Sequence, residues 1–159
     1  MQSSDVFERL DQSGLAVYIR QSPLLFPAIE IVHIAGFIVL VGSAFLFDLR
    51  LLGVAKKIPV RDVAGYVLPW SRRSLMVVAP SGLLLFISQA EALSTNGVFG
   101  LKLILIFLAF TNAGIFLRFT FRSVSNWSTS TPPAATAAAI ISLVLWTSVI
   151  TCGRLIAYF

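Results

Sequence analysis

The sequence predicts an all-α membrane protein, a four-transmembrane antiparallel helical bundle preceded by a short N-terminal surface helix. Hydrophobic residues make up 57% of the chain and charged residues only 12%, whereas soluble domains carry about 25% charged residues. The apolar run 24–47 has 24 residues, which would cover about 36 Å as a helix and so cross a hydrocarbon core about 30 Å thick. Most of the chain must therefore face lipid or other apolar helices.

Residues 1–23 are expected to form a surface segment. Asp5 and Glu8 have the spacing of a capping box, and apolar residues follow at helical spacing, so a short helix is predicted at about 5–10. This helix is expected either to lie at the membrane interface or to pack as a cap on the mouth of the bundle. The segment lacks the apolar core of a cleavable signal peptide.

The remaining residues, 24–159, are expected to form one transmembrane domain with spans at about 24–47, 75–93, 98–117 and 134–159. The connection 48–74 is expected to be a polar, basic loop, and Pro80-Ser81-Gly82 should kink or locally open the second span. The fourth span begins with many alanines, and small side chains let helices approach closely in lipid.

The basic residues predict the topology. Eight of the twelve Lys and Arg fall in the connections after spans one and three: Arg50, Lys56, Lys57, Arg61, Arg72, Arg73, Arg118 and Arg122. Because basic loops are retained in the cytoplasm, both termini should lie on the outer side. The same distribution explains the net charge of +5 more simply than nucleic-acid binding does.

The first candidate site is formed by Glu30 and the only histidine, His33, which are three residues apart and share a helix face. In the predicted topology Glu30 lies about 9 Å and His33 about 14 Å below the outer end of span one. Lys102 and Arg154 fall in the same outer half, and the other half is expected to hold almost no ionisable group. Glu30 is expected to pair with Arg154, with Lys102 as the rival partner.

Two interpretations of this cluster stay open. In one, an outer-facing pocket binds a haem, a metal ion or a quinone-like molecule, with His33 as ligand or proton-transfer group. In the other, the charges form a buried ion-pair network that fixes helix register. A bis-histidine haem would need a second histidine from another copy of the chain, or else Met76 or Cys152 as second ligand. A homo-oligomer is therefore expected.

Several other classes of site are excluded. The sequence shows no Ser-His-Asp arrangement, phosphate-binding loop or paired-carboxylate motif, so a hydrolase or kinase is improbable. The single cysteine cannot form an internal disulfide, and no Cys or His cluster has zinc-site spacing. The thirteen phenylalanines are spread over all four expected spans, which indicates lipid contact and core packing rather than a cofactor site.

Three motifs carry a resemblance: Glu30-Ile31-Val32-His33, Asp48-Leu49-Arg50-Leu51-Leu52-Gly53 and Gly153-Arg154-Leu155-Ile156-Ala157-Tyr158. Together they resemble a family of bacterial four-span inner-membrane proteins of unknown function. The resemblance implies a location in the inner membrane, which with the loop charges places both termini in the periplasm. More loosely, an early histidine in span one followed by small residues is similar to the CopD copper-resistance family, which implies a copper ion.

The function expected from these observations is a membrane-embedded binding protein for a redox cofactor or metal. Haem b is favoured over copper, and the site is centred on His33 with Glu30, Lys102 and Arg154 around it. The competing class is a non-enzymatic structural or transport subunit, for copper or another solute, whose outer-half charges hold the helices together or line a path.

Overall fold

The computed structural model describes residues 3–127 and 131–158, and no strand occurs in these two ranges. In chain order the elements are α1 (Ser3–Asp11), α2 (Gly14–Gln21), α3 (Leu25–Leu51), α4 (Val60–Ser88), α5 (Ala90–Thr95), α6 (Gly97–Ile115), the π-helix η1 (Phe116–Thr120), the 3-10 helix η2 (Phe121–Asn126) and α7 (Pro133–Leu155).

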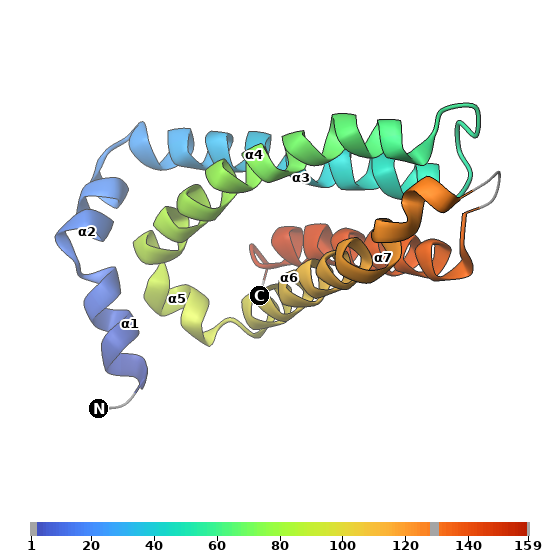
Figure 1. Cartoon of the computed structure of the whole chain (residues 1–159). Coiled ribbons are helices and arrows are strands. Elements are labelled where there is room, and N and C mark those ends of the chain that lie inside the picture. Colours follow the sequence, from blue (N-terminus) through green and yellow to red (C-terminus); the bar gives the residue numbers. More distant parts are fainter. Residues whose placement is uncertain (1–2, 128–130, 159) are drawn as a thin grey trace.

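The long helices form two antiparallel hairpins, α3 with α4 and α6 with α7 (Figure 1). The hairpins meet mainly through α3 and α7, and the short helix α5 links the end of α4 to the start of α6. The connection between α3 and α4 lies at one end of the bundle with η2. The helices α1, α2 and α5 lie at the other end.

Among the described residues, three helices are long and apolar enough to cross a membrane: Leu25–Leu51, Gly97–Val124 and Pro133–Leu155. They cover the first, third and fourth expected spans, although the last helix ends at Leu155 and Phe159 lies outside the described residues. The second expected span, 75–93, has different bounds in the structure. It is the apolar half of the longer helix α4, which ends at Ser88, and the separate helix α5 follows.

The prediction of a loop over 48–74 was wrong for most of its length. Lys and Arg are good helix formers, so basic residues do not end a helix by themselves. The chain leaves α3 at Gly53, which has a φ of 99°. The N–H groups of Gly53 and Val54 donate to the carbonyls of Arg50 and Leu49 at 3.1 and 3.0 Å. This is a Schellman motif, for which glycine is the favoured residue.

The N-terminal segment packs as a cap on one end of the bundle. It contains α2 as well as the expected helix, because Ser13 ends α1 and also caps α2, its Oγ accepting from the N–H of Ala16 at 3.3 Å. Arg20 ties the cap down: its guanidinium pairs with the carboxylate of Asp11 at 2.9 Å and donates to the carbonyl of Ser88 at 2.7 Å. The second contact places a positive charge at the C-terminal end of α4.

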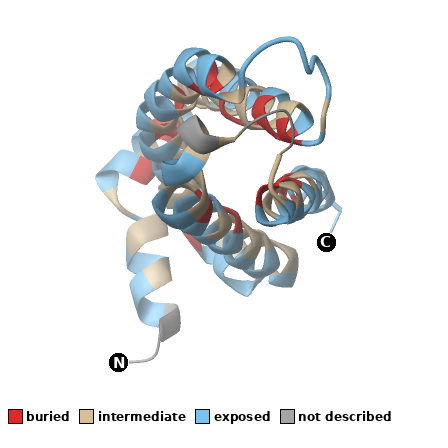
Figure 2. Ribbon diagram, turned by 45° about the vertical axis from the view of Figure 1, so that its right-hand side comes forward, coloured by how far each residue is buried: buried red, intermediate tan, exposed pale blue. Residues whose placement is uncertain are grey.

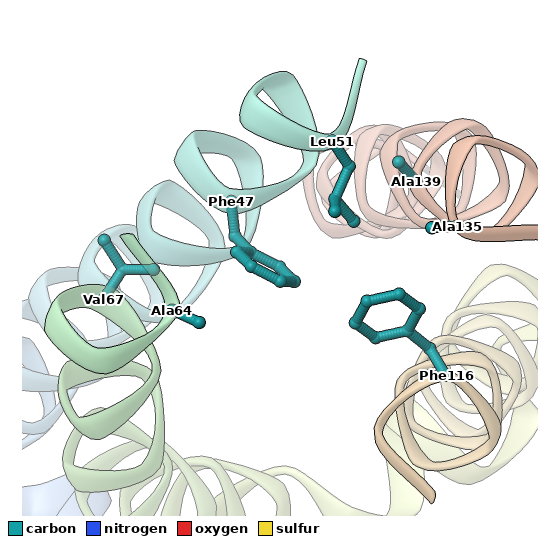
Figure 3. Close-up of a cluster of buried hydrophobic side chains, with 7 residues drawn as sticks. All are labelled: Phe47, Leu51, Ala64, Val67, Phe116, Ala135 and Ala139. Carbon is teal, nitrogen blue, oxygen red and sulfur yellow. The ribbon is translucent and has the colours of Figure 1, made fainter. Parts of the chain in front are cut away.

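Buried side chains lie on the inner faces of the helices, and the outer faces are exposed (Figure 2). Near the α3–α4 connection one cluster consists of Phe47, Leu51, Ala64, Val67, Phe116, Ala135 and Ala139 (Figure 3). Ala135 and Ala139 are fully buried, which agrees with close packing at the alanine-rich start of α7. A second cluster, Leu40, Val41, Ala109, Trp146 and Val149, lies nearer the middle.

The close approach of α3 to α4 depends on Gly36. A Cβ at Gly36 would lie 2.9 Å from Cγ2 of Val78, and a β-branched valine in a helix has little freedom to move away. Gly36→Ala is therefore expected to lower the free energy of unfolding by about 1–3 kcal/mol. Gly42→Ala on the same helix meets nothing within 4 Å and should cause no loss. Thermal unfolding of both variants in detergent would measure this, and equal stabilities would contradict it.

Candidate functional site

A large cavity lies between the two hairpins at the end of the bundle near α5. Its volume is about 1010 Å³, and it is bordered by residues of α3, α4, α6 and α7 together with Phe7 of α1. The polar and charged side chains that line it are Glu30, His33, Gln89, Ser94, Asn96 and Lys102. Three of the four site residues predicted from the sequence, Glu30, His33 and Lys102, are thus brought to one cavity.

The hydrogen bonds of His33 fix its tautomer. Nδ1 lies 3.1 Å from the carbonyl oxygen of Val78 and 3.0 Å from Oγ of Ser81. A carbonyl can only accept, so we assign the proton of the neutral ring to Nδ1. The hydrogen bonding of Ser81 is consistent with this assignment. Its hydroxyl donates to the carbonyl of Val77 at 2.6 Å, so its oxygen can accept from Nδ1 of His33. Nε2 then carries an available lone pair, and it has no hydrogen-bond partner in the described part of the chain.

The position of the imidazole ring is fixed by its neighbours. A Cβ at Gly82 would lie 2.8 Å from Cε1 of His33, so only glycine leaves room for the ring against α4. Phe37, one helical turn along α3, stacks on it with ring centroids 6.5 Å apart and an interplanar angle of 16°. The tripeptide Pro80-Ser81-Gly82 thus supplies both a hydrogen-bond partner and the space for the ring, while α4 stays helical through Pro80 and bends (Figure 1).

Lys102 brings a positive charge to the opposite wall. It is half-buried, and its Nζ would lie 3.6 Å from a Cβ at Gly153 of α7. Its ammonium makes no hydrogen bond or ion pair within the two described ranges. An ammonium group in this position has unused donors, which a carboxylate or phosphate group could accept.

The predicted pairing of Glu30 with Arg154 was wrong. No ion pair within 4.0 Å joins these two residues. Arg154 is exposed and turns along its own helix end, where it donates to the hydroxyl of Tyr158 at 2.8 Å and lies over its ring. Because α7 ends there, the guanidinium can reach the surface and needs no buried partner. Arg154 does not line the cavity.

The proposed second ligands for a haem are also absent from the cavity lining. Met76 is 76% exposed, and neither it nor Cys152 borders the cavity. Across residues 3–127 and 131–158, no group of three or more His, Cys, Asp or Glu side chains is placed to hold a metal ion. The cavity therefore offers one imidazole as a nitrogen ligand.

The sequence interpretation missed the aromatic walls. Phe86 and Phe99 stack with centroids 5.5 Å apart and an interplanar angle of 6°. Trp146 lies edge-on to Phe37 at 6.1 Å and to Phe110 at 5.8 Å. All five rings line the cavity. A signal existed for one pair, since Phe86 and Phe99 flank the predicted turn between two spans, but the other contacts join helices far apart in the sequence.

Chemically, the site combines a lone-pair nitrogen, a free ammonium group and flat aromatic walls. With the neutral ring protonated at Nδ1, His33 can coordinate a metal or accept a proton through Nε2, and Nε2 becomes a donor only after it has accepted a proton. A largely apolar cavity with a few polar groups is typical of sites for organic ligands and cofactors.

Comparisons with known proteins assign a family and no reaction. No curated protein and no solved structure gives a match, so the loose likeness to the CopD family has no support from them. The model of a family described as a family of unknown function (DUF6644) matches residues 22–159, from just before α3 to the end of the chain, and leaves α1 and α2 outside. The chain therefore belongs to this family of unknown function.

Proposed function

We propose that this protein is a four-span integral membrane protein that binds haem b in the large cavity, where Nε2 of His33 would be the atom that holds the iron. The fourth span in this proposal is α4, whose 29 residues run antiparallel to α3 and would cover about 43 Å. Arg72 and Arg73 lie before its apolar half, where long basic side chains can reach the interface.

The observation that carries the proposal is the hydrogen bonding of His33. Histidines that ligate metals donate their other ring N–H to a carbonyl or carboxylate, which fixes the tautomer and orients the ring. His33 has this arrangement, because Nδ1 donates towards the carbonyl of Val78 and Nε2 is unpartnered. The stacked ring of Phe37 and the edge of Trp146 provide flat apolar contacts beside it.

Lys102 suits the two carboxylates of haem. A propionate accepting from its ammonium would satisfy a half-buried cation that has no partner among the described side chains. Glu30 lines the same cavity from α3, so the propionates are expected to lie towards Lys102 and away from Glu30. Copper is less well supported, since a copper ion takes several protein ligands and only His33 and Glu30 are available as a neighbouring pair.

The proposed location is the bacterial inner membrane with both termini outside. The basic residues Arg50, Lys56, Lys57 and Arg61 lie beside the α3–α4 connection, at the end of the bundle opposite α5. By the positive-inside rule that end faces the cytoplasm, and the cavity opens outwards. The homo-oligomer stays a prediction. Two small residues of α7, Ala138 and Cys152, pack inside this chain and so are not free to form a contact between copies.

The test is an optical spectrum of the purified protein, produced in cells supplied with a haem precursor. We expect about one haem b per chain with a Soret band. With His33 as the one nitrogen ligand from the cavity, the ferric spectrum should be high-spin and should become low-spin when imidazole is added. A colourless preparation that contains no haem after this supply would contradict the proposal, and a quinone in its lipid extract would support the quinone alternative instead.

A transport subunit is the second candidate. The ion-pair network that the sequence predicted for this class is not formed, because Glu30 and Arg154 do not pair. A second cavity, however, lies beyond the first along the bundle. The two share Leu40, Leu75, Phe110 and Trp146 in their linings. Two cavities in line, separated by apolar side chains, are compatible with a solute path that opens by movement of these residues.

A further inference from the structure

Asp48 is buried within the bundle, contrary to the expectation that this end of the spans holds almost no ionisable group. The sequence prediction ended span one at Phe47, but α3 continues to Leu51 and turns Asp48 inwards. Only 5% of Asp48 is exposed, and its Oδ2 has no hydrogen-bond partner in the described part of the chain. Unpaired buried carboxylates are costly and, within membranes, commonly mark functional positions.

Asp48 lines the second cavity, which has a volume of about 320 Å³ and takes residues from α3, α4, α6, η1 and α7. Its walls are mostly apolar, with Phe47, Phe110, Phe116 and Trp146 among them. The polar side chains besides Asp48 are Ser71, Arg72, Asn112 and Ser142. The amide N–H of Asn112 is already committed to the carbonyl of Ala138 at 3.0 Å.

The lining defines the kind of ligand that would fit. The Asp48 carboxyl makes a hydrogen bond with the side chain of Ser142, but it has no ion-pair partner in the described residues, and this arrangement calls for a positive charge. Aromatic faces also attract cations, above all organic ammonium groups. A metal cation would need about six oxygen ligands, whereas the polar oxygens here are few and the walls are apolar. A volume near 300 Å³ is at the small end of sites for organic ligands.

Among the described residues that line this cavity, Arg72 is the one with a positive side chain. It is exposed, so its charge is partly screened by the surroundings. It makes no ion pair with Asp48 in the described structure. Arg72 therefore does not neutralise Asp48, and its positive charge at the cavity wall would repel a bound cation.

We propose that the cavity around Asp48 is a binding site for a small organic cation, an ammonium group attached to an apolar body, with Asp48 as its counter-ion. The proposal does not depend on haem, because it concerns the other cavity and the opposite end of the bundle. A buried carboxylate that has no charged partner among the described residues is then explained by a ligand that supplies the missing charge.

The experiment is calorimetric titration of the haem-free protein in detergent with benzyltrimethylammonium, with benzyl alcohol as the neutral probe of similar body. We expect the cation to bind more tightly than the alcohol. Asp48→Asn should weaken binding of the cation at least about tenfold, because a desolvated charge pair is lost. Glu30→Gln, which removes a carboxylate from the other cavity, should leave the affinity unchanged.

A second variant guards against a folding defect in Asp48→Asn. Arg72→Gln keeps Asp48 and changes an exposed side chain, and it should tighten binding because the repelling charge is removed. The proposal is overturned if the wild-type protein does not distinguish the cation from benzyl alcohol, if Asp48→Asn and Arg72→Gln both leave the affinity unchanged, or if Na⁺ at constant ionic strength displaces the probe. The last result would assign the site to a metal cation.

Discussion

Replacing His33 with alanine is expected to abolish haem binding, leaving a colourless protein that remains folded. Loss of a residue that hydrogen-bonds to a metal ligand typically lowers metal affinity about 10- to 100-fold. Haem affinity should fall further in His33→Ala, because the ligand itself is lost. His33 is only half-buried, so its removal should cost little stability. Haem content and the Soret band of the purified variant, compared with the wild-type protein, would measure this.

Two further variants separate ligation from packing. His33→Gly should regain a Soret band when imidazole is added, since the imidazole can occupy the space of the missing ring. Gly82→Ala keeps the histidine but places a Cβ 2.8 Å from Cε1, and it should lower haem affinity about 10- to 100-fold. Gly65→Ala on the same helix meets nothing within 4 Å and is the matched control. Equal haem content in His33→Ala and wild-type protein would rule out His33 as the ligand.

Replacing Trp146 with alanine is expected to cost the most stability of any single change considered, about 3 kcal/mol in the free energy of unfolding. Only 5% of this side chain is exposed, and its ring meets both Phe37 and Phe110 edge-on. Its removal leaves a void next to both cavities, because Trp146 borders each of them. Unfolding in detergent, followed by circular dichroism, would measure the loss.

Phe107→Ala is the matched control for this prediction. Phe107 is also aromatic and lies on α6, but 69% of it is exposed, so its ring faces away from the bundle. Its truncation should change stability by no more than about 0.5 kcal/mol. If the two truncations destabilise the protein equally, Trp146 is not a central packing residue and the wall between the cavities is not formed as described.

Much of the fold could be predicted from hydropathy alone. The apolar runs that begin near residues 24, 98 and 134 are each long enough to span a bilayer, and each lies in a helix that begins within one residue of the predicted start. The ends of the helices were predicted less well. α3 and α4 extend into the basic segment 48–74 because lysine and arginine favour helix. The helix is interrupted between Gly53 and Pro59, where Gly53 and Ala55 have positive φ and Pro59 has a fixed φ.

The candidate site was predicted in part. Spacing placed Glu30 and His33 on one face, and the alternation of helix direction brought Lys102 to the same end, as the cavity lining shows. Arg154 was placed at the right end of the bundle but on the wrong side of its helix. A charge near a helix end can turn to the surface or to the interior, and the sequence does not specify which.

The sequence by itself determined that the chain forms apolar helices long enough to cross a membrane and that its single histidine lies within the first of them, because length and hydropathy are local properties. Only the tertiary structure decided which atoms His33 uses, that Gly82 makes room for its ring, and that Asp48 faces a cavity rather than the solvent. Those features depend on the rotation of each helix about its axis. The rotation is set by contacts between residues such as Gly36 and Val78, which are far apart in the chain and meet only when α3 and α4 pack.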